Sequence, residues 1–175
     1  ESDWQYMLYG SDFYLELLKF NGMLLHSSCV VVDDEAYIFS ADSGVGKSTH
    51  TKLWLKHFGE RAYILNDDKP ALRLIDKTVY ACGTPFSGKF DISVPKVVKL
   101  EGICFLSRGL ENKIEKANVS DAVFKILSQT LRKLQLENMN NLFDVIEGIF
   151  SSVPLYNLEC NISDEAVLTS YNAMK

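Results

Sequence analysis

The feature that most constrains the fold is the glycine loop of residues 41–48, which reads Ala-Asp-Ser-Gly-Val-Gly-Lys-Ser. An apolar run over 36–39 precedes it, and an apolar helical pattern over 49–58 follows it. A strand, a glycine turn and a helix in this order match the P-loop pattern G-x-x-x-x-G-K-[S/T], with Ala41 in place of the first glycine. An ordinary glycine-rich turn is the alternative, but the lysine, the serine and both flanking elements agree with the motif.

Each residue type in this loop has a physical use in holding phosphate groups. Glycines let successive N–H groups turn inward, and the start of the following helix adds its positive end. The Lys47 ammonium can reach the outer phosphates, and the Ser48 hydroxyl can ligate Mg²⁺. We therefore expect ATP and Mg²⁺ as cofactors. The expected nucleotide-binding residues are Ser43, Gly44, Val45, Gly46, Lys47, Ser48 and Thr49.

A pair of carboxylates, Asp67 and Asp68, follows an apolar run over 63–65. Neighbouring strand residues point to opposite faces, so both can reach one site only where the chain leaves the sheet, which Pro70 favours. One carboxylate can then hold Mg²⁺ together with Ser48, while the other accepts a proton from an attacking hydroxyl. A solvated turn is the alternative interpretation, because this composition is common in turns.

The remaining apolar runs predict an α/β fold with a mixed sheet. Two pairs of short runs predict antiparallel hairpins over 29–39 and 71–82, which a regular parallel nucleotide-binding sheet would lack. The other predicted elements are helices over 14–20, 122–134 and 139–150, a helix beginning at Ser163, and strands over 103–106 and 155–160. We expect one domain over residues 1–175, with the P-loop and flanking helices around the sheet.

Composition excludes several classes of protein. The 175 residues carry 18 Lys plus Arg against 23 Asp plus Glu, a net charge of −5, and the basic residues do not cluster, which argues against nucleic-acid binding. No apolar run approaches the roughly 20 residues of a membrane span, and the first residues lack a secretion pattern, so we expect a cytoplasmic protein without a membrane partner. The 4 cysteines are far apart and are predicted to be free, buried thiols.

Residues 26–70 resemble the catalytic domain of the HPr kinase/phosphorylase family and, more broadly, the phosphoenolpyruvate-carboxykinase-like P-loop fold. The resemblance rests on Leu25-His26 before the hairpin, on the glycine loop, and on Ile-Leu-Asn-Asp-Asp over 64–68. It implies that His26 lies beside the terminal phosphate or its metal. It also implies that Lys47 and the loop amides hold the phosphates.

The same resemblance implies that Ser48 and Asp68 hold Mg²⁺ and that Asp67 is the catalytic base, with the two aspartate roles exchangeable. The Arg-Gly-x-Gly signature of HPr kinases is missing, so the chain resembles a divergent member. Residues 83–89, Gly-Thr-Pro-Phe-Ser-Gly-Lys, are similar to a loop of HPr-kinase-like proteins grouped with peptide-modification systems. We expect Lys89 to reach the phosphate or the acceptor, with a solvated turn lysine as the alternative.

The predicted activity is Mg-ATP-dependent phosphotransfer to a Ser/Thr-type hydroxyl of a small protein, a peptide or a small molecule. Arg108, after the strand over 103–106, is a candidate for stabilising charge on the moving phosphoryl group. A simple nucleoside triphosphatase and a non-catalytic ATP-binding or sensing module are the alternatives. The assembly that the resemblance implies is a homo-oligomer.

Overall fold

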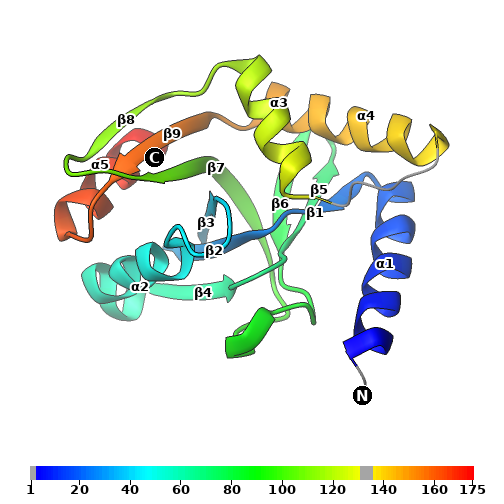
Figure 1. Ribbon diagram of the computed structural model, residues 1–175, viewed down its shortest axis with the longest axis horizontal. Coiled ribbons are helices and arrows are strands. Elements are labelled where there is room, and N and C mark those ends of the chain that lie inside the picture. Colours follow the sequence, from blue (N-terminus) through cyan, green and yellow to red (C-terminus); the bar gives the residue numbers. More distant parts are fainter. Residues whose placement is uncertain (1–2, 131–135) are drawn as a thin grey trace.

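The secondary structure alternates hairpins with helices. The computed structural model describes residues 3–130 and 136–175, and the side chains of these residues apart from 3–7, 89 and 136. The helices are α1 (Asp3–Lys19), α2 (Lys47–Phe58), α3 (Val119–Ser128), α4 (Leu136–Ser152) and α5 (Asp164–Met174), with short 3₁₀ turns η1 (Gly59–Arg61) and η2 (Gly88–Phe90) (Figure 1). The strands are β1 (Gly22–Leu24), β2 (Ser27–Val32), β3 (Glu35–Ser40), β4 (Ala62–Asn66), β5 (Ala71–Ile75), β6 (Thr78–Cys82), β7 (Val97–Arg108), β8 (Lys113–Lys116) and β9 (Leu155–Cys160).

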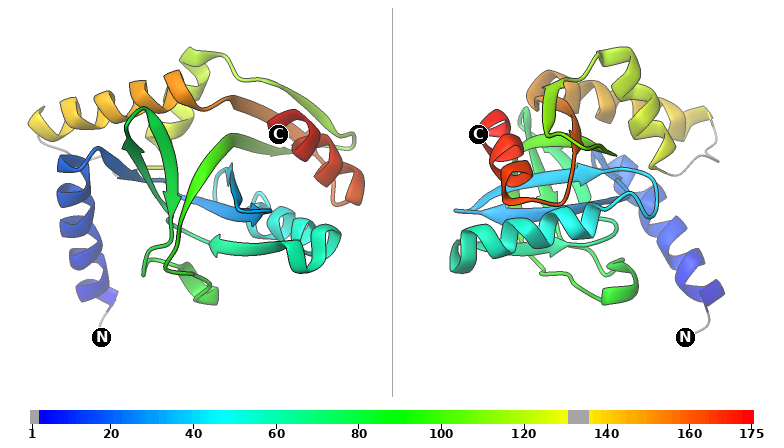
Figure 2. Two further views of the ribbon diagram at one scale, coloured as in Figure 1. Left: turned by 180° about the vertical axis from the view of Figure 1, so that it is seen from behind. Right: turned by 60° about the vertical axis from the view of Figure 1, so that its left-hand side comes forward.

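The sheet is mixed, as the hairpin pattern predicts. Its order is β1-β5-β6-β7-β3-β2-β4, and β9 pairs with both β7 and β8. The β3–β7 and β7–β9 pairs are parallel and the others are antiparallel. The long strand β7 pairs with β6 through residues 97–99 and with β3 beyond that point, so it curves from one half of the sheet to the other (Figure 2). This architecture confirms the predicted fold class, an α/β fold with a mixed sheet and flanking helices.

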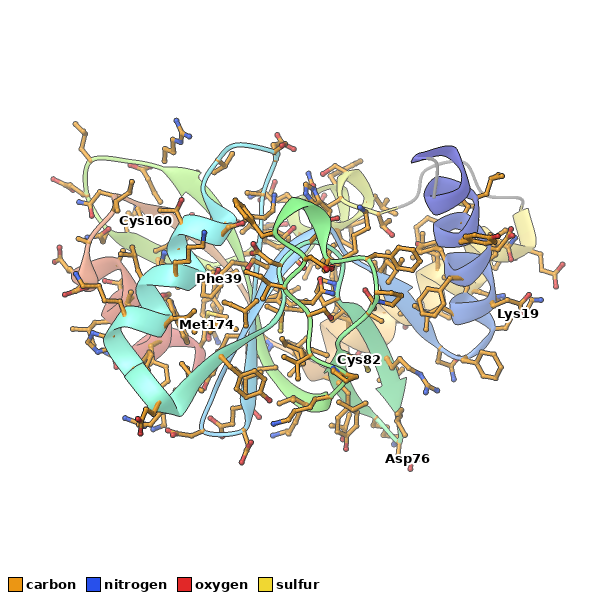
Figure 3. The ribbon with its side chains drawn as sticks, turned by 90° about the horizontal axis from the view of Figure 1, so that it is seen from below. Lys19, Phe39, Asp76, Cys82, Cys160 and Met174 are labelled. Atoms are coloured by element: carbon orange, nitrogen blue, oxygen red, sulfur yellow. The ribbon has the colours of Figure 1, made fainter. Side chains whose placement is uncertain are left out.

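Helices cover both faces of the sheet. The side chains of β2 alternate, with Cys29 and Val31 in a core that includes α1, α3 and α4, and Val30 and Val32 in a core that includes α2 and α5. The second core contains Trp54, and Figure 3 shows two of its other members, Phe39 and Met174, beside α2. Figure 1 places α1 at one end of the molecule and α2 at the other. The glycine loop connects β3 to α2, two elements of the second core.

Several predicted elements differ in extent from the observed ones. Helix α1 begins well before the predicted 14–20, the predicted strand over 103–106 is the central part of β7, and α3 covers only the first part of the predicted helix over 122–134. Residues 131–135 of that prediction lie outside the described residues. Strands β1 and β8 were not predicted, because β1 is three residues long and β8 has four residues with a lysine at each end and only one apolar residue.

Two smaller features concern the cysteines and the character of the helices. All 4 cysteines are free, as predicted, but only Cys29 and Cys104 are buried, whereas Cys82 and Cys160 are half-buried. Burial raises the pKa of the Cys29 and Cys104 thiols far above their usual range, so both stay protonated. Within residues 3–130 and 136–175, no helix has the length and apolar character that crossing a membrane requires.

Candidate functional site

The glycine loop connects the end of β3 to the first turn of α2. Gly44 has φ +83° and Gly46 has φ +131°, and a Cβ at either position would meet no heavy atom within 4 Å. Glycine is therefore required here by backbone conformation and not by crowding. No described side chain caps the N-terminus of α2, so the first N–H groups of the helix face the loop. This arrangement can accept the oxygens of an anion.

Lys47 is a buried cation at the base of the loop. Its side chain is 8% exposed, and its Nζ donates to the carbonyl oxygen of Ala41 at 2.9 Å. Burial lowers the pKa of Lys47, while the carboxylates of Asp68, Asp42 and Asp67 act in the opposite direction. The lysine thus lies within electrostatic reach of both paired aspartates, as the motif spacing predicts.

Arg108 braces the loop from the end of β7. Its Nε donates to the carbonyl oxygen of Val45 at 3.0 Å, and its Nη2 donates to the carbonyl oxygen of Gly44. The guanidinium was a candidate for contacting a moving phosphoryl group. In this structure the guanidinium contacts two carbonyl oxygens of the glycine loop, and its contact with a phosphoryl group stays a prediction.

The turn that carries the paired aspartates is fixed by Asn66, which is fully buried. Its side-chain oxygen accepts from the N–H of Asp68 at 3.0 Å and from the N–H of Lys69 at 2.8 Å, which is an Asx-type turn. Its Nδ2 donates to the carbonyl oxygen of Thr84 at 3.1 Å. One buried amide therefore orients both carboxylates and ties their turn to the loop of residues 83–88.

Asp67 points toward α2. Its side chain is 8% exposed, and its Oδ1 accepts from Ser28 Oγ at 2.6 Å. Ser28 Oγ also lies 2.9 Å from Thr51 Oγ1 of α2, and because Ser28 gives its one hydroxyl proton to Asp67, Thr51 is the donor in this contact. A short hydrogen-bonded path therefore joins Asp67 to the helical turn that contains Ser48.

Asp68 has different side-chain partners from those of Asp67. Its Oδ2 accepts from Lys69 Nζ at 2.6 Å, and its Oδ1 lies 3.5 Å from His26 Nε2. Gly88, with φ +69°, packs behind this carboxylate, because a Cβ there would meet the Asp68 Cβ at 2.9 Å. The backbone of Lys89 follows in η2, but its side chain lies outside the described ones, so its proposed contact stays a prediction.

His26 is held by a residue that sequence reasoning missed. Its Nδ1 lies 2.8 Å from Gln129 Oε1, and its N–H donates to the carbonyl oxygen of Gln129 at 2.8 Å. The Gln129 amide nitrogen in turn donates to Asp42 Oδ1 at 2.7 Å. Contacts thus run from the glycine loop through Gln129 and His26 to Asp68. Nothing local in the sequence marks Gln129, which directly follows the amphipathic helix α3.

Two cavities adjoin this group of side chains, and each is named for the ligand proposed for it below. The nucleoside-side cavity, of about 530 Å³, lies beside the glycine loop, and its lining includes Val45, Thr49, Leu53, Leu106, Arg108 and Ile162. The acceptor-side cavity, of about 440 Å³, lies between α1 and the end of α3, and its lining includes Tyr14, Leu24, His26, Lys69, Phe86 and Gln129. Gly44 and Gly46 line the first cavity, and His26 and Lys69 bring the second beside Asp68.

Most of the predicted site residues converge. Lys47, Asp67, Asp68 and His26 form one group, and the half-buried Ser48 lies in the first turn of α2. Ser43 and Thr49 are exposed at the loop and at the helix start. This convergence places the side chains, and their roles stay predictions.

Comparisons with known proteins include a distant structural likeness. No protein-family model matches the sequence, and no curated protein matches it either. Among solved structures, the chain is similar to the HPr(Ser) kinase/phosphatase from Coxiella burnetii, with a TM-score of 0.47 and 10% sequence identity. The alignment covers 86% of this chain and 95% of that one.

Proposed function

We propose that the protein is a Mg-ATP-dependent phosphotransferase that acts on an alcohol hydroxyl. The observation that carries this proposal is the pair of carboxylates beside Lys47, one directed toward the P-loop helix and the other toward His26 and a separate cavity. A protein that only binds a nucleotide needs the first carboxylate but has no use for the second. Two differently directed carboxylates suit a reaction between two bound molecules.

The donor side suits ATP. The N–H groups of the glycine loop and the first turn of α2 would hold phosphate oxygens, and Lys47 Nζ would exchange the carbonyl of Ala41 for a phosphate oxygen. The nucleoside-side cavity would take the base and ribose, with Leu53, Leu106 and Ile162 as its apolar surface.

The donor set near the loop fits Mg²⁺ carried by a nucleotide. Within the described part of the chain, no group of three His, Cys, Asp or Glu side chains could hold a metal ion alone. Mg²⁺ usually takes one or two protein oxygens and completes its shell with phosphates and water, so Ser48 and one aspartate suffice. When bound, Mg²⁺ neutralises charge on the phosphates.

We assign the metal-binding role to Asp67 and the proton-accepting role to Asp68. Asp67 is joined through Ser28 and Thr51 to the helical turn that carries Ser48. Asp68 instead lies between His26 and Lys69, both of which line the acceptor-side cavity. This assignment exchanges the two roles that the sequence resemblance implies, an exchange that the resemblance leaves open.

In the proposed step, the acceptor oxygen forms a bond to the γ-phosphorus of ATP. The bond between that phosphorus and the β,γ-bridging oxygen breaks, and ADP leaves with the bond's electron pair. The hydroxyl proton passes to Asp68 Oδ1, which His26 Nε2 faces at 3.5 Å. Lys47 remains near the phosphates and offsets their charge.

The test follows phosphorus-31 NMR of the protein with Mg-ATP and a pool of acceptors that contains free serine, HPr and serine peptides. A new phosphoester signal that is lost in Lys47→Ala would support the proposal. Release of inorganic phosphate alone would instead favour a simple triphosphatase. Unchanged ATP together with retained Mg-ATP binding would favour the sensing module.

A further inference from the structure

The acceptor-side cavity has an apolar body and one polar end. Its wall is built by Tyr14 from α1, Leu24 from β1 and Phe86 from the loop that packs against Asp68. The polar groups His26, Lys69 and Gln129 lie together, and the first two contact Asp68. An apolar pocket with a few converging polar groups is the usual form of a small-ligand site, and about 440 Å³ lies within the usual size range.

The wall formed by Tyr14 is fixed and uncharged. The ring is 2% exposed, and its hydroxyl lies 2.6 Å from Thr130 Oγ1, which donates to the carbonyl oxygen of Leu24 at 2.9 Å. Burial raises the pKa of Tyr14 to about 12, so the phenol stays neutral at physiological pH. The polar tip of this tyrosine is therefore satisfied within the wall, so Tyr14 brings no unpaired polar group to the cavity.

The wall formed by Phe86 is also held in place. Phe86 is 6% exposed, and its ring centroid lies 5.5 Å from that of Phe13. Gly10 lets α1 approach this ring closely, because a Cβ there would lie 3.3 Å from it. The cavity thus has two aromatic rings in its wall before any ligand binds, which lowers the ordering cost of binding.

We propose that this cavity binds an aromatic or comparably large apolar group carried next to the acceptor hydroxyl. This inference rests on the proposed function, because the hydroxyl would then lie at the polar end, beside His26 and Asp68. A charged group would lose its hydration against Tyr14, Leu24 and Phe86. The apolar group could belong to a peptide residue next to a serine or to a free alcohol, and both sources share this chemistry.

The first experiment compares matched acceptors with the wild-type protein and Mg-ATP. The peptide pair is N-acetyl-seryl-phenylalaninamide and N-acetyl-seryl-alaninamide, and the free alcohols are 2-phenylethanol and ethanol. We expect kcat/KM to be roughly tenfold to a hundredfold higher for the aromatic member of each pair. This is the ratio that full burial of one aromatic ring would produce. The pair with the larger preference identifies the source of the group. Equal kcat/KM values within both pairs would overturn the inference and leave the kinase proposal standing.

The second experiment fills the cavity. Ser11 lines it from α1, whereas the neighbouring Asp12 is exposed and does not. Ser11→Trp should remove the aromatic preference and leave Mg-ATP affinity unchanged, while Asp12→Trp on the same helix should keep both. An unchanged preference in a folded Ser11→Trp protein would contradict the inference. If Ser11→Trp does not fold, the kcat/KM values of the matched acceptors with the wild-type protein test the inference.

A binding measurement separates this inference from the proposed function. Binding of 2-phenylethanol without nucleotide is followed by NMR shifts of residues that line the cavity, in the wild type and in Ser11→Trp. If no acceptor yields a phosphoester but 2-phenylethanol binds the wild type and not Ser11→Trp, the cavity assignment stands and the kinase proposal fails. If neither 2-phenylethanol nor the phenylalanine peptide binds the wild type, the cavity assignment fails.

Discussion

Gln129 Oε1 lies 2.8 Å from His26 Nδ1, and this contact determines which ring nitrogen carries the proton. The orientation of the Gln129 amide is set on its other side, where Nε2 donates to the Asp42 carboxylate. The oxygen of the amide must then face His26, so His26 Nδ1 is the donor. In the neutral ring, Nε2 therefore presents its lone pair to Asp68.

We expect Gln129→Glu to lower kcat about tenfold or more and to leave the Kd for Mg-ATP nearly unchanged. A carboxylate at this position is repelled by Asp42, so it no longer holds the His26 ring. Adding Asp42→Asn supplies an amide donor to that carboxylate and should restore most of kcat. Steady-state kinetics of the two single variants and the double variant check this. A double variant as impaired as Gln129→Glu would contradict the positioning role.

Asparagine substitutions distinguish the metal-binding role proposed for Asp67 from the proton-accepting role proposed for Asp68. Asp67→Asn should weaken Mg-dependent ATP binding about tenfold or more, because it removes a charged metal ligand. Asp68→Asn should keep that affinity and lower kcat by about 10²–10⁴, the usual contribution of a positioned base. Calorimetric titration with Mg-ATP and single-turnover transfer measure the two effects. The reverse pattern would restore the roles implied by the sequence resemblance.

The sequence predicts the local parts of the site well, because a glycine loop and an adjacent carboxylate pair are fixed by the backbone around them. The two hairpins were predicted for the same reason, since a short turn determines which strands pair. Lys47 and Asp67 are brought together by a strand, a helix and a second strand, whose order already implies their proximity.

The supporting contacts could not be predicted, because they join distant segments. Gln129 lies 103 positions from His26, and Ser28 lies 39 positions from Asp67. The periodicity of apolar residues does not indicate which distant side chains form hydrogen bonds. The contact of Arg108 with the glycine loop likewise depends on parallel pairing of β7 with β3, which neither strand encodes alone.

Gly88 should matter for activity beyond its backbone conformation. Gly88→Ala and Gly59→Ala both place a side chain at positive φ, +69° and +58°, and each should cost about 1 kcal/mol of unfolding free energy. Only at Gly88 does the new Cβ meet Asp68, at 2.9 Å. Transfer activity should therefore fall in Gly88→Ala and persist in Gly59→Ala, measured beside urea unfolding curves. Equal activities would show that Asp68 tolerates the displacement.

His50 should make the fold sensitive to mild acid. It is 4% exposed, and its Nε2 accepts a hydrogen bond from Trp54 Nε1 at 3.2 Å. Because the indole N–H can only donate, this contact requires that His50 Nε2 carries no proton. Burial lowers the pKa of His50 from 6.5 to about 4. The unfolded chain therefore binds a proton more readily than the folded one between these values. The stability that His50 contributes is fully present above pH 6.5. It is lost as pH falls toward 4, which lowers the free energy of unfolding by up to about 3 kcal/mol.

A matched pair of variants on α2 isolates this contribution. His50→Gln keeps an acceptor for Trp54 but cannot titrate, so the free energy of unfolding should depend less on pH between 6.5 and 5 than in the wild type. His57→Gln removes an exposed histidine from the same helix and should keep the wild-type slope. Urea unfolding at several pH values measures both slopes. A His50→Gln protein that loses stability toward pH 5 as steeply as His57→Gln would mean that His50 takes up its proton equally in the folded and unfolded chains.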